Sequence, residues 1–188
     1  MGRLIYFTIA SLDGFIEDSE GRFQWATPDE EVFAFTNELE RPIGTDLYGR
    51  RMYEVMVFWE TAPTEGATAL EREFANAWRA EQKIVFSRTL KAVSSGNTRI
   101  EREFTPEIVE QLKRTSDRDL SISGAELAGQ AVKAGLVDEL QLLIVPKIVG
   151  GGKPWLPKDV RVELALLETR KFASGFFYLR YGLKHPTS

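Results

Sequence analysis

The stretch Asp119-Leu-Ser-Ile-Ser-Gly124-Ala-Glu-Leu-Ala-Gly129-Gln130 indicates the fold most directly, because a short apolar strand turns at a glycine straight into a helix. The first turn of a helix leaves N–H groups without partners, and the helix dipole makes that end positive. Glycine lacks a Cβ, so a pyrophosphate can approach the backbone at Gly124. Gly124 and Gly129 do not have the GxGxxG spacing. Two interpretations stay open: a dinucleotide cradle, or a tight strand–helix connection of an α/β fold.

Strands and helices alternate through the rest of the chain. The first strand is apolar on both faces, which is typical of a central strand covered on both sides. At Thr27-Pro-Asp-Glu30 the pattern predicts a helix start, with Thr27 as N-cap, Pro28 in the first turn and Glu30 closing a capping box. We expect strands at 4–10, 45–48, 83–87, 119–123, 140–145, 162–169 and 176–183, and helices at 28–39, 50–54, 67–81, 105–115 and 125–134. This order predicts an α/β fold with a mixed, mainly parallel sheet flanked by helices and a C-terminal antiparallel hairpin.

Length and composition predict one domain, residues 1–183, followed by a polar tail, residues 184–188. The chain has no cysteine, and its one histidine, His185, lies in the tail. Disulfides, cysteine or histidine metal sites and Ser–His–Asp catalysis are therefore not expected. The net charge of −4 argues against a nucleic-acid partner. No apolar run approaches the ~20 residues that span a membrane, and the N-terminus has no leader pattern, so we expect a cytoplasmic protein.

Two further strand ends carry phosphate-binding chemistry. Gly49-Arg50-Arg51 and Ser87-Arg88-Thr89 each follow a predicted strand, where α/β sheets place ligands. Arginine forks match phosphate oxygens, and hydroxyl groups add donors. Each segment alone also fits a solvated arginine after a strand. The run Gly150-Gly-Gly152 is not a Walker A loop, because Pro154 follows Lys153, and we interpret it as a turn that lines a pocket.

Five motifs in chain order resemble the dihydrofolate-reductase-like superfamily, over nearly the whole chain. They are Ser11-Leu-Asp13-Gly14, Gly49-Arg50-Arg51, Phe86-Ser87-Arg88-Thr89, Ser123-Gly124-Ala125-Glu126-Leu127 and Val149-Gly-Gly-Gly-Lys153-Pro154. More closely, the chain is similar to stand-alone relatives of the reductase domain of the bifunctional riboflavin-biosynthesis deaminase-reductase. The resemblance implies a reductase fold and NADPH as the cofactor. It places NADPH against Gly49, Arg50 and Arg51, with Ser87 and Arg88 at the 2′-phosphate, Gly124, Ala125, Glu126 and Leu127 at the pyrophosphate, and Thr8, Ile9 and Ala10 at the nicotinamide.

Two carboxylates are candidates for catalysis. The resemblance aligns Glu30 with the acid that helps to deliver a proton in dihydrofolate reductases, although the capping box explains the same residue structurally. Asp13 is the second candidate, and its structural alternative is an Asx-type turn before Gly14. Four large aromatics could form an aromatic wall or belong to the core: Trp25, Phe33, Trp59 and Trp155.

The resemblance implies an NADPH-dependent oxidoreductase that transfers a hydride to a small heterocyclic or sugar-like substrate. It would be similar to 5-amino-6-(5-phosphoribosylamino)uracil reductase. One alternative is a dihydrofolate-type reductase. The single glycine in Gly124-Ala125-Glu126 argues against this alternative. Another is a dinucleotide- or pterin-binding dimer without turnover. We expect a homodimer, because the predicted hairpin carries more apolar side chains than one sheet face needs: Leu164, Leu166, Leu167, Phe172, Phe176, Phe177, Tyr178 and Leu179.

Overall fold

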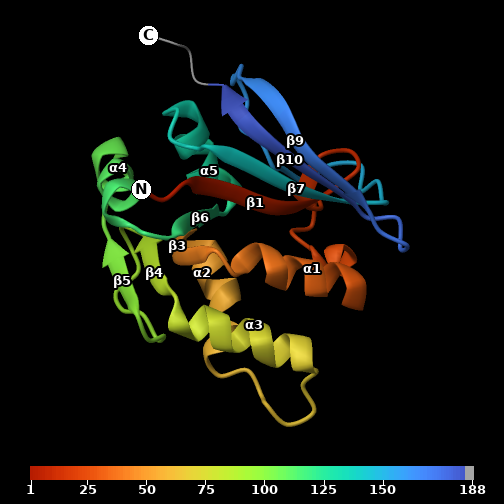
Figure 1. Cartoon of the computed structure of the whole chain (residues 1–188), viewed down its shortest axis with the longest axis horizontal. Helices are drawn as coiled ribbons and strands as arrows, with labels where there is room; N and C mark the ends of the chain where they lie inside the picture. Colours follow the sequence, from red (N-terminus) through yellow and green to blue (C-terminus); the bar gives the residue numbers. More distant parts are fainter. Residues whose placement is uncertain (185–188) are drawn as a thin grey trace.

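An eight-stranded sheet with the order β5-β4-β3-β6-β1-β7-β10-β9 forms the centre of the molecule (Figure 1). The structure, a computed structural model, describes residues 1–184. The sheet strands are β1 (Leu4–Ser11), β3 (Ile43–Gly49), β4 (Gln82–Phe86), β5 (Thr98–Glu101), β6 (Asp119–Ser123), β7 (Glu139–Val145), β9 (Glu163–Lys171) and β10 (Phe177–Lys184). A separate two-stranded ribbon pairs β2 (Phe15–Glu17) with β8 (Lys153–Pro154). The helices are α1 (Glu30–Glu40), α2 (Arg50–Met56), α3 (Ala69–Ala80), α4 (Pro106–Thr115) and α5 (Ala125–Lys133), with short 3₁₀ turns η1 (Gln24–Ala26) and η2 (Val57–Glu60).

The predicted fold class is confirmed. Strands β5, β4, β3, β6, β1 and β7 are parallel to one another, whereas β10 runs antiparallel to both β7 and β9. The C-terminal hairpin thus completes a mainly parallel sheet. The sequence interpretation missed β5, which is a short edge strand with a polar pattern, Thr-Arg-Ile-Glu. The predicted tail, apart from Lys184 at the end of β10, lies outside the described residues together with His185.

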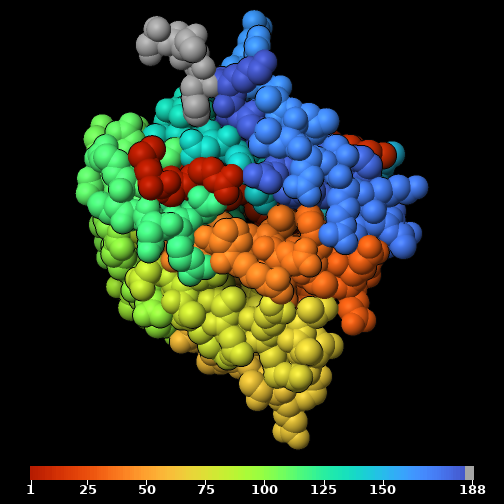
Figure 2. Space-filling view, in the orientation of Figure 1, coloured from red at the N-terminus to blue at the C-terminus, as the bar shows by residue number. Residues whose placement is uncertain are grey.

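The sheet is covered on both faces, as expected for a fold whose central strand is apolar on both sides. One face packs against α4 and α5 through a core that includes Leu4, Tyr6 and Val109. The other face packs against α1, with Val32 and Phe35 among its core residues. Figure 2 shows α1 in orange between the blue hairpin and the yellow α3. None of the helices among residues 1–184 is long and apolar enough to cross a membrane.

The predicted capping box at the start of α1 is wrong. The N-cap is Asp29, whose Oδ1 accepts a hydrogen bond from the N–H of Val32 at 2.9 Å. Thr27 instead donates its hydroxyl to the carbonyl of Gln24 at 2.8 Å and closes η1. Glu30 is the first helical residue and therefore cannot be the third residue of a box.

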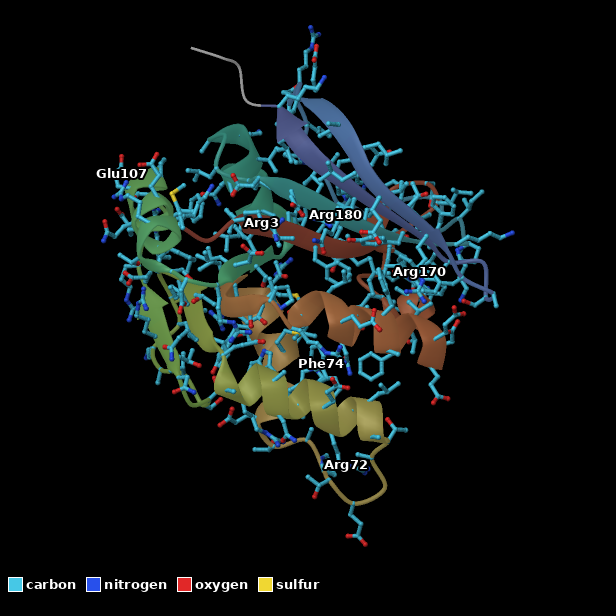
Figure 3. All side chains as sticks on the ribbon, viewed as in Figure 1. Arg3, Arg72, Phe74, Glu107, Arg170 and Arg180 are labelled. Atoms are coloured by element: carbon cyan, nitrogen blue, oxygen red, sulfur yellow. The ribbon has the colours of Figure 1, made fainter. Side chains whose placement is uncertain are left out.

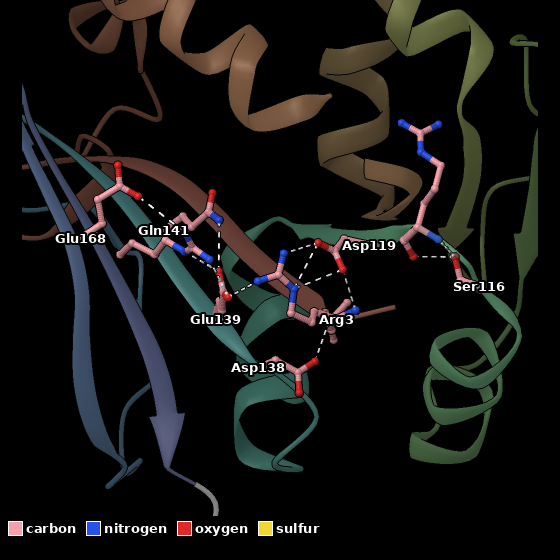
Figure 4. Close-up of polar contacts among 10 residues, drawn as sticks. Arg3, Ser116, Asp119, Asp138, Glu139, Gln141 and Glu168 are labelled. Carbon is pink, nitrogen blue, oxygen red and sulfur yellow. Dashed lines mark hydrogen bonds and ion pairs between the residues drawn. The ribbon is translucent and has the colours of Figure 1, made fainter. Parts of the chain in front are cut away.

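Partly buried ion pairs join the start of β1 to β6, β7 and β10 at the end of the sheet where β1 begins (Figure 4). Glu139 lies between two arginines: it is bonded to Arg3, and it accepts from Arg180 at 2.7 and 3.0 Å. Arg3 also reaches Asp119 at 2.5 Å. The Glu139 side chain is only 8% exposed, so the two guanidiniums supply the compensation that a buried carboxylate needs. This cluster tethers the first strand and the hairpin to the centre of the sheet.

Candidate functional site

The three predicted phosphate-binding segments lie side by side. Strands β4, β3 and β6 are neighbours, with Gly49 opposite Phe86 and Tyr48 opposite Ser123. Their carboxyl ends therefore reach the same edge of the sheet, and the segments after Gly49, Phe86 and Ser123 meet there. This edge is where open α/β sheets bind ligands.

The joint at Gly124 has the backbone geometry that the sequence indicates. Its φ is +95° and ψ is +117°, a conformation that favours glycine. Helix α5 begins directly after it without a side-chain cap, and the same is true of α2 after Gly49. A Cβ built on Gly124 would lie 3.5 Å from the Cβ of Met52, and one on Gly49 would lie 3.9 Å from the Cβ of Leu127. The starts of α2 and α5 are thus in contact at one edge.

Arginine side chains surround these two helix starts. Arg50 Nε donates to Glu54 at 2.7 Å, and a second nitrogen donates to Thr89 Oγ1 at 3.0 Å, which links the ends of β3 and β4. Arg51 is exposed. The side chain of Arg88 is 80% exposed, and its ion pair with Glu103 is long, at 3.7 Å. The edge therefore offers several guanidinium donors close to one another.

Ser87 forms part of the turn after β4. Its Oγ accepts from the N–H groups of Thr89 at 3.3 Å and Leu90 at 3.0 Å, and the residue is buried. These bonds use the oxygen as an acceptor and leave its O–H to donate. Sequence reasoning treated this hydroxyl only as a phosphate ligand and missed its role in shaping the turn.

The glycine run connects to the start of α5 through Lys153, whose Nζ lies 2.8 Å from Glu126 Oε1. The hydrogen bond and the charge of Lys153 lower the pKa of the Glu126 carboxyl. Gly152 lies so close to the backbone of β2 that a Cβ would fall 2.0 Å from the carbonyl oxygen of Glu17. The glycine run is therefore held against the same helix start as the arginines.

Asp13 holds the glycine run in place. Its two carboxylate oxygens accept from the N–H of Val149 at 3.1 Å and of Gly150 at 2.8 Å. The hydroxyl of Ser11 and these N–H groups lower the pKa of Asp13. The turn from Ser11 to Gly14 is closed by the backbone, with 2.9 Å from N to O. These bonds give Asp13 a structural role and favour its ionised form.

Among residues 1–184, the second half of β1 has a strand neighbour on only one side. This half contains Thr8, Ile9 and Ala10. The pairing of β1 with β6 extends to Tyr6 opposite Ile122, whereas its pairing with β7 continues to Ser11. Beyond Tyr6, the edge of β1 that faces β6 is open, and β6 has already turned at Gly124 into α5. We call this feature, where β1 continues but its neighbour β6 has ended, the step in the sheet. The predicted nicotinamide segment lies on one side of the step, and the predicted pyrophosphate segment lies on the other.

Glu30 is exposed in the first turn of α1. Its neighbour Glu31 instead accepts from the N–H of Ala173 at 3.3 Å, which ties this turn to the loop between β9 and β10. Arg170, labelled in Figure 3 beside the hairpin, lies over the ring of Phe35 at 4.7 Å. With Asp13 bonded to the backbone, Glu30 is the candidate carboxylate whose side chain has no structural bond among residues 1–184.

The four large aromatics do not form one wall. Phe33 and Trp59 both pack on Phe74, at 6.0 and 4.8 Å between ring centroids, and Phe74 lies between α1 and α3 in Figure 3. Trp155 packs on Tyr6 at 6.2 Å instead. Trp25 packs against the core beneath α1. Their main role is packing, at three different places.

Sequence reasoning also missed a buried group of acids, Glu40, Asp46 and Glu81, on the α1 and α3 side of β3. Burial, reinforced by the neighbouring carboxylates, raises the pKa of both glutamates. The available signal was Asp46, an acid in the middle of a predicted apolar strand.

A model of the RibD C-terminal domain family matches residues 3–178. The chain belongs to the RibD C-terminal domain family. Protein YyaP of Bacillus subtilis strain 168 is 32% identical over 181 residues, which cover 95% of this chain and 94% of YyaP. YyaP carries the description "uncharacterized protein".

Solved structures share the fold of the RibD C-terminal domain. A putative riboflavin biosynthesis protein from Shewanella sp. PV-4 is 19% identical, with a TM-score of 0.76 over 97% of this chain and 99% of that chain. The diaminohydroxyphosphoribosylaminopyrimidine deaminase/5-amino-6-(5-phosphoribosylamino)uracil reductase of Thermotoga maritima is 15% identical, with a TM-score of 0.66 over 97% of this chain and 57% of that chain. A pyrimidine reductase-like protein of Corynebacterium diphtheriae is 16% identical, with a TM-score of 0.64 over 98% of this chain and 92% of that chain.

Proposed function

We propose that this chain is an NADPH-dependent reductase that transfers a hydride to a small heterocyclic or sugar-like substrate, similar to the uracil reductases of riboflavin biosynthesis. Membership of the RibD C-terminal domain family supports a reductase. The observation that carries the proposal is the step in the sheet: β1 continues past its last pairing with β6 and lies open beside the start of α5.

The residues present fit NADPH. The uncapped first turn of α5, with its positive end and free N–H groups, suits a pyrophosphate. Arg50 and Arg88 are available for the 2′-phosphate, because each side chain is at least partly exposed and each residue follows one of two neighbouring strands, β3 and β4. Lys153 neutralises Glu126, which would otherwise repel a pyrophosphate at this helix start.

The chain's own contribution is positioning. NADPH supplies the hydride when it is bound. The open edge of β1 at Thr8, Ile9 and Ala10 presents backbone groups that would orient the nicotinamide. Asp13 keeps the glycine run against this site and so helps to exclude water. Glu30 would pass a proton to the substrate, since it is the free carboxylate of the two candidates.

The second candidate is a dinucleotide-binding module without turnover. It is favoured by the hydrogen bonds of Asp13 to the backbone and by the exposure of Glu30, which leaves the candidate proton donor in contact with solvent. A dihydrofolate-type reductase is less favoured, because the segment Gly124-Ala125-Glu126 carries only one glycine at the helix start.

We also propose that the protein is a homodimer through the hairpin. Strand β9 is an edge strand, and its Leu166 and Leu167 are 57% and 52% exposed. Part of the apolar surplus that the sequence suggested is used internally, because Phe172, Phe176 and Tyr178 are buried in the chain's own core. A two-fold contact that covers the remaining leucines would remove both the apolar surface and the unpaired edge.

The test measures the oxidation of NADPH through the loss of its absorbance. Riboflavin-pathway intermediates, dihydrofolate and simple carbonyl compounds are offered as substrates one at a time. We expect turnover with a riboflavin-pathway intermediate or a related heterocycle. Tight NADPH binding without oxidation by any compound in the panel would favour the binding module. Absence of NADPH binding would contradict both candidates.

A further inference from the structure

Three acidic side chains from three elements meet on the α1 and α3 side of β3. Glu40 ends α1, Asp46 lies within β3, and Glu81 directly follows α3. One carboxylate oxygen from each lies within 4.8 Å of the other two. Asp46 and Glu81 are 2% and 6% exposed. This group is separate from the proposed cofactor edge, which begins with the helix after Gly49.

One oxygen of Asp46 lacks a hydrogen-bond partner within residues 1–184. The Oδ1 of Asp46 accepts from the hydroxyl of Ser121, but its Oδ2 is buried and makes no hydrogen bond in that part of the chain. Asp46 lines a cavity of about 10 Å³ together with Glu40, Tyr48, Trp78 and Glu81. That volume is about the size that one water molecule or one ion needs. Buried polar atoms without a partner are rare, and this oxygen borders a space in which a ligand fits.

The nearby basic group does not pair with these acids. Lys83 Nζ donates to the carbonyl of Trp78 at 2.6 Å and to that of Glu81 at 2.9 Å. Within residues 1–184, no ion pair includes Glu40, Asp46 or Glu81. The indole N–H of Trp78 is used by Tyr48 at 3.1 Å. Buried charges are normally paired or coordinate a metal. Among the residues that the structure describes, the charged form of this group has no ion-pair partner.

We propose that Glu40, Asp46 and Glu81 bind one hard divalent cation such as Ca²⁺ or Mn²⁺. Carboxylate oxygens are the ligands that these ions prefer, and Ca²⁺ binds oxygen at about 2.3–2.6 Å, so oxygens on opposite sides are about 5 Å apart. The spacing of at most 4.8 Å fits this geometry. The bound ion would join the ends of α1 and α3 to β3. Its role is structural, because Asp46 precedes the cofactor edge on the same strand and does not reach it.

The test is a titration of the chelator-treated protein with Mn²⁺. The electron paramagnetic resonance signal of Mn²⁺ measures how much of the ion stays free at each step. We expect one saturable Mn²⁺ site per chain, displaced by Ca²⁺. Glu40→Gln should weaken Mn²⁺ binding about tenfold or more, since one of three charged ligands is lost. Glu38→Gln, which removes an exposed charge from the same helix, should bind Mn²⁺ as the wild type does.

Melting temperature gives an independent measurement. At one Ca²⁺ concentration, Ca²⁺ should raise the melting temperature of the wild type and of Glu38→Gln more than that of Glu40→Gln. Absence of saturable Mn²⁺ binding to the wild type, or equal Mn²⁺ affinity in wild type and Glu40→Gln, would overturn the proposal. Glu40 is only partly buried, so this variant should fold even if a change at the more deeply buried Asp46 does not.

Discussion

Gly124→Ala separates the role of the helix start in ligand binding from its role in stability. The φ of +95° and ψ of +117° at this residue lie outside the regions that alanine adopts readily. The added Cβ would lie 3.5 Å from Met52, which is an ordinary contact, so the cost is mainly backbone strain. Strain of this kind costs about 1–3 kcal/mol. For a chain of this length we expect the melting temperature to fall by roughly 2–10 °C.

The effect on the cofactor follows from relief of that strain. If the backbone at residue 124 rotates, the first N–H groups of α5 no longer point at the pyrophosphate. Loss of one hydrogen bond to a charged group is worth about 1.5–3 kcal/mol, so NADPH should bind about 10-fold to 100-fold more weakly. Isothermal titration calorimetry measures the NADPH affinity, and calorimetric melting measures the stability.

Gly21→Ala is the matched control. Gly21 also has a positive φ, +76°, and a Cβ there would meet nothing within 4 Å. We expect a loss of stability of about 1–2 kcal/mol with unchanged NADPH affinity. If Gly124→Ala lowers the melting temperature but binds NADPH as tightly as Gly21→Ala does, the helix start is not the pyrophosphate site.

Three other predictions concern the acid, the ion pairs and the dimer. Glu30→Gln should lower kcat by roughly 100-fold without changing NADPH affinity, as for loss of a general acid, whereas Glu38→Gln should not change kcat; equal kcat in both would exclude Glu30 as the proton donor. Burial opposes ionisation of Glu139, but the bonds from Arg180 outweigh this effect and lower the pKa of Glu139. Ionised Glu139 therefore stabilises the fold at pH values above the unfolded carboxyl pKa of about 4.3. This contribution is lost as the pH falls through the pKa of Glu139 in the folded protein. Glu139→Gln should cost about 1–3 kcal/mol at neutral pH, in view of the partly exposed arginines, and should flatten the acid limb of stability measured by urea unfolding; an unchanged acid limb would contradict this. Leu166→Glu should convert a dimer to a monomer in light scattering at micromolar concentration, and a monomeric wild type would disprove the proposed dimer.

The architecture could be predicted because its signals are local. The glycine between the predicted strand and helix indicates a positive φ at residue 124, since few other residues adopt that φ. The predicted ranges 105–115 and 125–134 likewise agree with α4, whose N-cap is Thr105, and with α5, which is followed by Gly135 at a φ of +68°. The buried run of β1 required cover on both faces, which the helices provide. These features depend on a few adjacent residues and on periodicity, which a sequence displays directly.

The errors occurred where two local patterns competed or where distant residues met. Thr27 and Asp29 both precede a helix as possible N-caps, and the choice depended on η1, which uses the Thr27 hydroxyl. Asp13 could form a local turn, but its carboxylate binds a segment more than a hundred residues away. The pairing of Lys153 with Glu126 and the buried acids around Asp46 likewise depend on tertiary contacts that no spacing in the sequence encodes.

The affinity of the unmodified protein for NADPH compared with NADH tests the central claim most directly. The two cofactors differ by the 2′-phosphate, which Arg50 and Arg88 are proposed to bind with bonds of about 1.5–3 kcal/mol each. We predict NADPH affinity at least about tenfold above that for NADH, and loss of most of this difference when both arginines are changed to alanine. Equal affinities for the two cofactors in the unmodified protein would contradict the assignment.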